Sequence, residues 1–113
     1  SGTVELMKQL KKAGYPVYGL SNWSAETFPL VREKYEFFDL LDDIILSGEV
    51  GAIKPDREFF EIALQRIGRP ARECLFIDDA LANIEQAQKM GFVTVHFISP
   101  DQLAEELHRL QIL

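Results

Sequence analysis

Helical and extended patterns alternate along this chain, and that alternation restricts the fold more than any other feature of the sequence. Helical patterns cover residues 2–13, 24–35, the stretch from Pro55 to Ile67, residues 80–90 and the stretch that begins at Pro100; short apolar runs fill residues 15–20, 44–46, 74–77 and 92–97. Strands that are continuous apolar runs between helices are typical of a parallel sheet covered on both faces. The sequence therefore predicts a Rossmann-like α/β fold.

Residues that often begin or end helices stand at the boundaries of these patterns. The candidate N-caps and C-terminal stops are Thr3, Ser24, Gly14, Gly68 and Gly91. Residues 47–53 contain two glycines and are predicted to be a loop. In the helix over residues 80–90, Leu81 begins the stripe expected to face the core.

Length and composition indicate one compact domain over residues 1–113. Hydrophobic residues make up 47% of the chain, which is enough for a buried core. The formal net charge of -6 disfavours nucleic acid as a partner, because an acidic chain repels the phosphate backbone. No apolar stretch approaches the roughly 18 residues of a membrane span. A single cysteine, Cys74, cannot form an internal disulfide, so we expect a cytoplasmic protein with Cys74 in its core.

Polar residues follow three of the predicted strands. Ser21 and Asn22 follow the first strand, Lys54 lies in the segment after the second, and Asp78 and Asp79 follow the third. The carboxyl ends of parallel strands meet at one edge of a sheet, where functional residues gather in such folds. We therefore expect a hydroxyl, a cation and two carboxylates to lie close together.

Each of these groups has a chemical and an ordinary structural interpretation. The adjacent carboxylates of Asp78 and Asp79 suit Mg²⁺, although one of them, Asp79, would also cap a helix beginning near Ala80. Ser21 and Asn22 can bind an anion, but serine and asparagine also favour turns. Lys54 precedes a proline at the mouth of a helix and is suited to phosphate, whereas most lysines are simply solvated.

Other polar or aromatic residues carry weaker signals. His96 lies within a strand pattern and is expected to be structural or half-exposed. Trp23 and Phe28 fit the core better than a substrate mouth, and His108 is expected to be solvated.

Three segments taken in order resemble the second, third and fourth motifs of the haloacid dehalogenase superfamily. They are Leu20-Ser21-Asn22, Gly51-Ala52-Ile53-Lys54-Pro55-Asp56 and Phe76-Ile77-Asp78-Asp79-Ala80-Leu81-Ala82-Asn83-Ile84, the last followed by Ala87 and Gly91. The resemblance runs over roughly residues 14–97 and implies a partial core domain of a phosphohydrolase.

The resemblance also implies roles for single residues. Ser21 and Asn22 would bind the transferring phosphoryl group, and Lys54 would neutralise its oxygens. Asp79 would bind Mg²⁺ directly, with Asp78 as a second, water-mediated ligand. Asn83 stands where many relatives have an acidic residue and would steady the loop. These roles fit phosphoryl transfer, which depends on positioning and charge neutralisation.

The chain departs from the family pattern in one important respect. The family's first motif, Asp-x-Asp, supplies the nucleophile, and no Asp-x-Asp occurs in these 113 residues. In the family sheet the strand carrying that motif is central, between the strands predicted near residues 16–20 and 74–78. Its absence would leave two apolar strand edges unpaired. We therefore expect a missing N-terminal segment of the same protein, containing the nucleophile and the cap, as a partner of this chain.

Three functional interpretations remain open from the sequence. The carboxylate pair favours a magnesium-dependent phosphatase acting on a small phosphorylated substrate, because family dehalogenases need no magnesium. A receiver-like phospho-acceptor module uses similar residue types, but in another order. A non-catalytic binding or scaffold protein on a degenerate fold is the third possibility. Neither a dinucleotide fingerprint nor a P-loop occurs.

Overall fold

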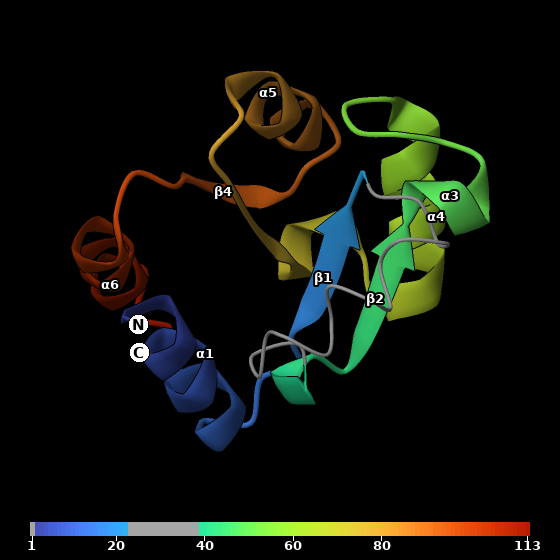
Figure 1. Ribbon diagram of the computed structural model, residues 1–113. Coiled ribbons are helices and arrows are strands. Elements are labelled where there is room, and N and C mark those ends of the chain that lie inside the picture. The colour runs from blue at the N-terminus through green and yellow to red at the C-terminus, as the bar shows by residue number, and fades with distance from the viewer. Residues whose placement is uncertain (1, 23–38) are drawn as a thin grey trace.

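The computed structural model describes residues 2–22 and 39–113 (Figure 1). Along these ranges the order is α1 (Gly2–Lys12), β1 (Tyr18–Ser21), β2 (Asp43–Leu46), α3 (Ser47–Val50), α4 (Arg57–Ile67), the short 3-10 helix η2 (Ala71–Glu73), β3 (Leu75–Asp78), α5 (Leu81–Lys89), β4 (Val93–His96) and α6 (Pro100–Arg109). The predictions for residues 24–35, Ser24, Trp23 and Phe28 lie outside the described residues.

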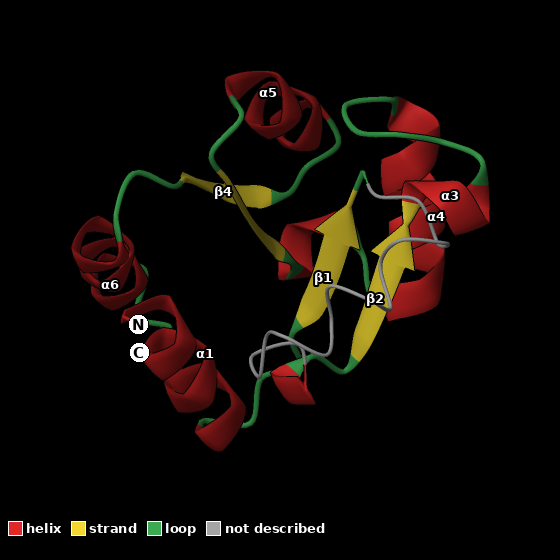
Figure 2. Ribbon diagram, viewed as in Figure 1, coloured by secondary structure: helices red, strands yellow, loops and turns green. Residues whose placement is uncertain are grey.

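The strands form two parallel pairs (Figure 2). β1 pairs with β2 so that Ser21 lies opposite Leu46, and β3 pairs with β4 so that Asp78 lies opposite His96. The predicted parallel α/β fold is confirmed. Within the described residues no hydrogen-bonded ladder joins β1 to β3, so the sheet is present as two halves. That a further strand of the native protein lies between them stays a prediction.

The structure corrects three details of the sequence-based prediction. Residues 47–53 are not all loop, because one helical turn, α3, is closed by the bond from the N–H of Gly51 to the carbonyl of Ser47. Thr3 lies inside α1 and is not its N-cap, since the helix already begins at Gly2. Leu81 is 55% exposed because it is the first residue of α5, at the end of the helix beyond the core.

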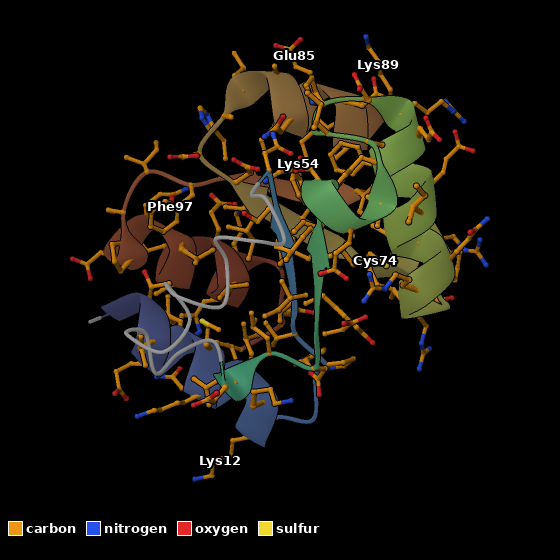
Figure 3. All side chains as sticks on the ribbon, turned by 45° about the vertical axis from the view of Figure 1, so that its right-hand side comes forward. Lys12, Lys54, Cys74, Glu85, Lys89 and Phe97 are labelled. Carbon is orange, nitrogen blue, oxygen red and sulfur yellow. The ribbon has the colours of Figure 1, made fainter. Side chains whose placement is uncertain are left out.

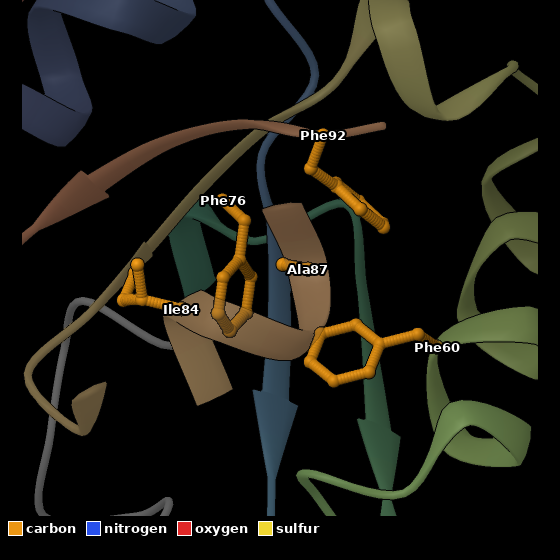
Figure 4. Packing of buried hydrophobic residues seen from close by; sticks show 5 residues of the cluster. All are labelled: Phe60, Phe76, Ile84, Ala87 and Phe92. Carbon is orange, nitrogen blue, oxygen red and sulfur yellow. The ribbon is translucent and has the colours of Figure 1, made fainter. Parts of the chain in front are cut away.

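An aromatic cluster joins α4 to β3, to α5 and to the residue that precedes β4 (Figure 4). Its buried members are Phe60, Phe76, Ile84, Ala87 and Phe92. The ring of Phe60 meets that of Phe76 edge to face at a centroid distance of 5.2 Å, and that of Phe92 at 5.8 Å. Leu20 of β1 also packs against this cluster. Side-chain packing therefore links the two halves of the sheet.

Two further clusters bury the remaining faces. Leu6 of α1, Val95 of β4, and Leu103 and Leu107 of α6 form one, against which Leu75 and Ile77 of β3 also pack. Because successive residues of a strand point to opposite faces, Leu75 and Ile77 contact this layer while Phe76 contacts α5. The other cluster lies between β2 and α4 and contains Ile45, Ala52, Phe59 and Ala63.

Helices thus cover both faces of the β3–β4 pair. α1 and α6 pack side by side, and the two chain ends lie close together beside them (Figure 1). Cys74 is only partly buried and packs at the margin of the aromatic cluster, so the expectation of a core cysteine holds only in part. None of the helices in the described ranges is long and apolar enough to cross a bilayer.

Phe60→Ala should lower the free energy of unfolding by about 3–5 kcal/mol, because it removes a fully buried ring that meets the rings of Phe59, Phe76 and Phe92 edge to face. Phe60→Leu should cost less, since more of the volume remains filled. Urea unfolding followed by circular dichroism measures both variants. Ile98→Ala is the control, because Ile98 is 74% exposed and its truncation should change the free energy by no more than about 0.5 kcal/mol.

Asp42, the residue before β2, is hydrogen-bonded to the end of α1 and to the segment between α1 and β1. Its carboxylate accepts hydrogen bonds from Lys11 Nζ at 2.7 Å and from the N–H of Val17 at 2.6 Å. The hydrogen bond from Lys11 and that from Val17 together hold the pKa of the Asp42 carboxyl below its ordinary value.

This lowered pKa makes the stability depend on pH. The stabilisation by Asp42 is complete above the ordinary aspartate pKa of about 3.9 and is lost as the pH falls through the lower folded value. Asp42→Asn should therefore destabilise the protein near neutral pH and make less difference in acid, as measured by urea unfolding from about pH 7 to pH 3. Glu105→Gln, at an exposed position on α6, should show no such change and serves as the control.

Candidate active site

Asn22 and Lys54 are joined through the Lys54 backbone. The Asn22 side chain, just beyond β1, donates from Nδ2 to the carbonyl of Lys54 at 3.1 Å. Its Oδ1 accepts from the N–H of Lys54 at 2.9 Å. The amide thereby fixes the main chain at the mouth of α4. Ser21 directly precedes Asn22 as the last residue of β1, so the first predicted pair lies beside the predicted lysine.

Lys54 points from this position to the end of β3. Figure 3 labels Lys54, which lies in the segment between α3 and α4. Its Nζ lies 2.9 Å from Asp78 Oδ2, and the two side chains are only 12% and 9% exposed. The ammonium also lies 5.9 Å from the centroid of the Phe76 ring. An ion pair this sheltered is screened much less by salt than a surface pair. The predicted convergence of the lysine with the acidic pair is thus present in the structure.

Asp78 is the more enclosed of the two adjacent aspartates. Its Oδ2 accepts from Lys54 and, at 3.0 Å, from Nδ2 of the buried Asn83, while Oδ1 accepts from the N–H of Ala80 at 2.9 Å. Burial alone would raise the pKa of the Asp78 carboxyl, but the Ala80, Lys54 and Asn83 donors outweigh it and hold that pKa below its ordinary value. Asp78 is therefore an ionised and nearly saturated acceptor.

Asp79 differs from Asp78 in its exposure and in its hydrogen bonding. It is exposed, and none of the described residues donates a hydrogen bond to its carboxylate. The alternative that Asp79 merely caps the next helix is wrong, because α5 has Ala80 as its N-cap and no side-chain capping bond. The main-chain carbonyl of Asp79 accepts a hydrogen bond from His96 Nε2 at 2.9 Å. Its carboxylate oxygens are thus left for a ligand from outside the described chain.

The donor set fits part of a magnesium site. Mg²⁺ is bound by oxygen, keeps several waters, and often takes only one or two protein carboxylates together with phosphate oxygens. Asp79 offers such an oxygen, and Asp78 lies next to it with its own lone pairs largely used. Across residues 2–22 and 39–113 no three acidic, histidine or cysteine side chains cluster as a metal site. The described residues therefore fit part of such a ligand set and not the whole of it.

Three contributors to this site were not foreseen from the sequence. The Phe76 ring beside Lys54 and the His96 contact to Asp79 join segments far apart in the sequence, which local patterns do not reveal. The Ala80 N–H is a local donor to Asp78, and the sequence pattern did not single it out. The parallel register of β3 and β4 would have located His96, because it lies opposite Asp78. Asn83 was expected to steady this loop, and its bond to Asp78 has that effect.

Comparison with known proteins places this geometry in a family. A sequence model described as haloacid dehalogenase-like hydrolase matches residues 1–91. The sesquiterpene phosphatase of Aspergillus oryzae is 38% identical over 105 residues, which are 93% of this chain and 54% of that protein.

Solved structures agree with this match. An uncharacterized protein from Corynebacterium glutamicum superposes with a TM-score of 0.77 at 31% identity, covering 93% of this chain and 77% of that one. A wild-type HAD family enzyme from Bacteroides thetaiotaomicron, in complex with magnesium and inorganic phosphate, gives 0.73 at 29% identity and covers 82% and 50%. This chain thus spans about half the length of the Aspergillus and Bacteroides proteins. Because the family model matches most of the sequence, the chain belongs to the haloacid dehalogenase-like hydrolases.

Proposed function

We propose that this chain is part of a magnesium-dependent phosphatase that hydrolyses a small phosphorylated metabolite through an aspartyl-phosphate intermediate. The observation that carries the proposal is the ion pair between Lys54 and Asp78. Asn22, which follows β1, holds the backbone of Lys54 in place beside the end of β3. A sheltered cation next to an exposed carboxylate suits a phosphate ester that is bound together with a divalent metal.

Each residue has a proposed role in this reaction. Lys54 neutralises the phosphoryl oxygens and the attacking carboxylate, and Ser21 donates its hydroxyl to the phosphoryl group. Asn22 keeps Lys54 in place through two backbone hydrogen bonds and has a remaining amide N–H for the same phosphoryl group. Asp79 is the direct metal ligand, and Asp78 orients Lys54 and reaches the metal through water. Bound Mg²⁺ would supply further charge neutralisation at the phosphoryl oxygens.

The nucleophile is proposed to come from a segment of the same protein that precedes these residues. Its carboxylate attacks phosphorus, and the alcohol leaves with a proton from a neighbouring acid. Water then attacks the acyl phosphate, which yields inorganic phosphate and regenerates the carboxylate. Phosphorus keeps its oxidation state throughout, so no redox partner is needed.

We propose that this upstream segment binds between the two halves of the sheet. β1 is hydrogen-bonded to β2 and β3 to β4, which leaves the other edge of β1 and of β3 without a ladder in the described residues. Unpaired apolar edges are a liability that a further strand would remove. We therefore place the upstream strand, and the nucleophile at its carboxyl end, between β1 and β3. With its single cysteine the protein is further proposed to act in the cytoplasm.

A second substrate candidate is an apolar phosphate ester. The Aspergillus relative is a sesquiterpene phosphatase. In this chain Ile53 is 52% exposed directly before Lys54, and Leu81 is 55% exposed two residues after Asp79. Exposed aliphatic side chains at these positions favour a substrate with an apolar organic group. A panel that pairs a sugar phosphate with a sesquiterpenyl monophosphate separates the two classes by kcat/KM.

The full-length protein is expected to hydrolyse a generic aryl phosphate only when Mg²⁺ is present. Lys54→Met and Asp79→Asn should each lower kcat/KM by at least about 100-fold, because each removes charge that stabilises the transition state. Release of inorganic phosphate measures the rate. Lys89→Met on α5 and Glu105→Gln on α6 are exposed controls of the same charge types and should keep full activity.

Several results of this assay would contradict the proposal. An inactive full-length protein with an intact Asp-x-Asp segment would favour a non-catalytic binding or scaffold protein. Activity that is unchanged in Asp79→Asn, or that is independent of a divalent metal, would remove the proposed magnesium site. Stable phosphorylation of an aspartate by acetyl phosphate would instead favour a receiver-like module.

The upstream strand makes a separate prediction for hydrogen exchange. In the full-length protein, the main-chain amides along the inner edges of β1 and β3 should be protected to the same degree as those that face β2 and β4. In a protein consisting of residues 1–113 alone, these inner-edge amides should exchange much faster, because they face solvent. Equal protection in both forms, measured by mass spectrometry, would show that no upstream strand binds there.

A further inference from the structure

We infer that His96 is a positioning residue that fixes the main chain at Asp79 so that the Asp79 carboxylate is presented to a divalent metal. The inference rests on the proposed role of Asp79 as a metal ligand. His96 Nε2 lies 2.9 Å from the Asp79 carbonyl oxygen. A carbonyl only accepts, so Nε2 carries the hydrogen and donates it.

The peptide groups on both sides of the Asp79 Cα are held by hydrogen bonds. On the near side, the carbonyl of Asp78 accepts from the N–H of Phe97 at 2.8 Å. On the far side, the Asp79 carbonyl accepts from His96, and the Ala80 N–H donates to Asp78 Oδ1. These bonds fix the direction of the Asp79 Cα–Cβ bond. Since no described residue holds the carboxylate itself, its aim depends on this backbone arrangement.

His96 is in turn held by the start of α6. It is the last residue of β4 and lies opposite Asp78 in the parallel register. Gln102 donates from Nε2 to the His96 carbonyl at 3.2 Å and accepts at Oε1 from the N–H of Ile98 at 3.1 Å. The Gln102 backbone is anchored by the Ser99 cap at 3.1 Å. The Gln102 side chain thus holds the backbone on both sides of the end of β4, and this sets the position of the His96 imidazole.

The exposure of His96 allows a clean test of this role. Its neighbour Val95 points into the core, whereas His96 is exposed, so replacing the imidazole leaves no core cavity. Removal of an outer partner of a metal ligand typically weakens metal binding by about 10- to 100-fold. If the His96 imidazole only stabilised β4, its replacement would change the stability of the protein and leave the affinity for the metal unaltered.

Mn²⁺ binding to the full-length protein, followed by electron paramagnetic resonance, tests the inference without any turnover. His96→Ala should raise the Kd for Mn²⁺ about tenfold. His96→Gln should restore it, because the glutamine amide nitrogen can occupy the place of Nε2. His96→Asn should behave like the alanine variant, because its amide is too short. His108→Ala, at the other histidine of the chain, should bind Mn²⁺ as the unaltered protein does.

Asp79→Asn separates failure of this inference from failure of the proposed function. If Asp79→Asn binds Mn²⁺ as tightly as the unaltered protein, the proposed metal site itself is wrong. If Asp79→Asn loses Mn²⁺ binding but His96→Ala keeps it, the positioning role of His96 is overturned. The same holds if His96→Gln restores the Kd for Mn²⁺ no better than His96→Asn does. Activity at saturating Mg²⁺ should show an unchanged KM for the aryl phosphate in His96→Ala.

Discussion

The ion pair between Lys54 and Asp78 is the interaction on which the site depends, because it joins the two halves of the sheet. Lys54 comes from the segment after β2, and Asp78 ends β3, so each belongs to a different strand pair. Burying two charges is costly unless further hydrogen bonds satisfy them. Asn83 and the Ala80 N–H do so for Asp78, and Asn22 fixes the backbone that carries Lys54. These hydrogen bonds lower the cost of burying the two charges, and they also keep the Lys54 ammonium at the ends of the strands.

Two adjacent aspartates of identical chemistry have different surroundings. Asp78, as the last residue of β3, is enclosed by donors, and Asp79, one residue later, is exposed with only its carbonyl engaged. A saturated carboxylate gains little from a metal, whereas an unengaged one still has lone pairs for it. The local environment thus supports the order of ligands that the family resemblance implied, with Asp79 direct and Asp78 more remote.

Strand positions and the convergence of the polar residues were predictable from the sequence, and the detailed contacts were not. The apolar run 74–77 predicted β3 within one residue, and the rule on parallel strand ends brought Lys54 to the acidic pair. The same patterns predicted Leu81 as buried and missed α3, because periodicity describes a helix face but not where the core ends. Nor can spacing tell which lone pairs of Asp78 are occupied, since that depends on how Lys54, Ala80 and Asn83 are placed in three dimensions.

Packing explains how two separate strand pairs keep one functional edge. Leu20 of β1 packs against both the aromatic cluster and the cluster between β2 and α4. The neighbouring residues Phe59 and Phe60 of α4 are divided between the same two clusters, with Phe60 in the aromatic one. These contacts tie the pairs together through side chains where no backbone ladder does. Apolar packing has little directional preference. It therefore keeps the two strand pairs close together without setting an exact distance between them. The polar groups at the strand ends, above all Lys54 and Asp78, add directional contacts between the two halves to this packing.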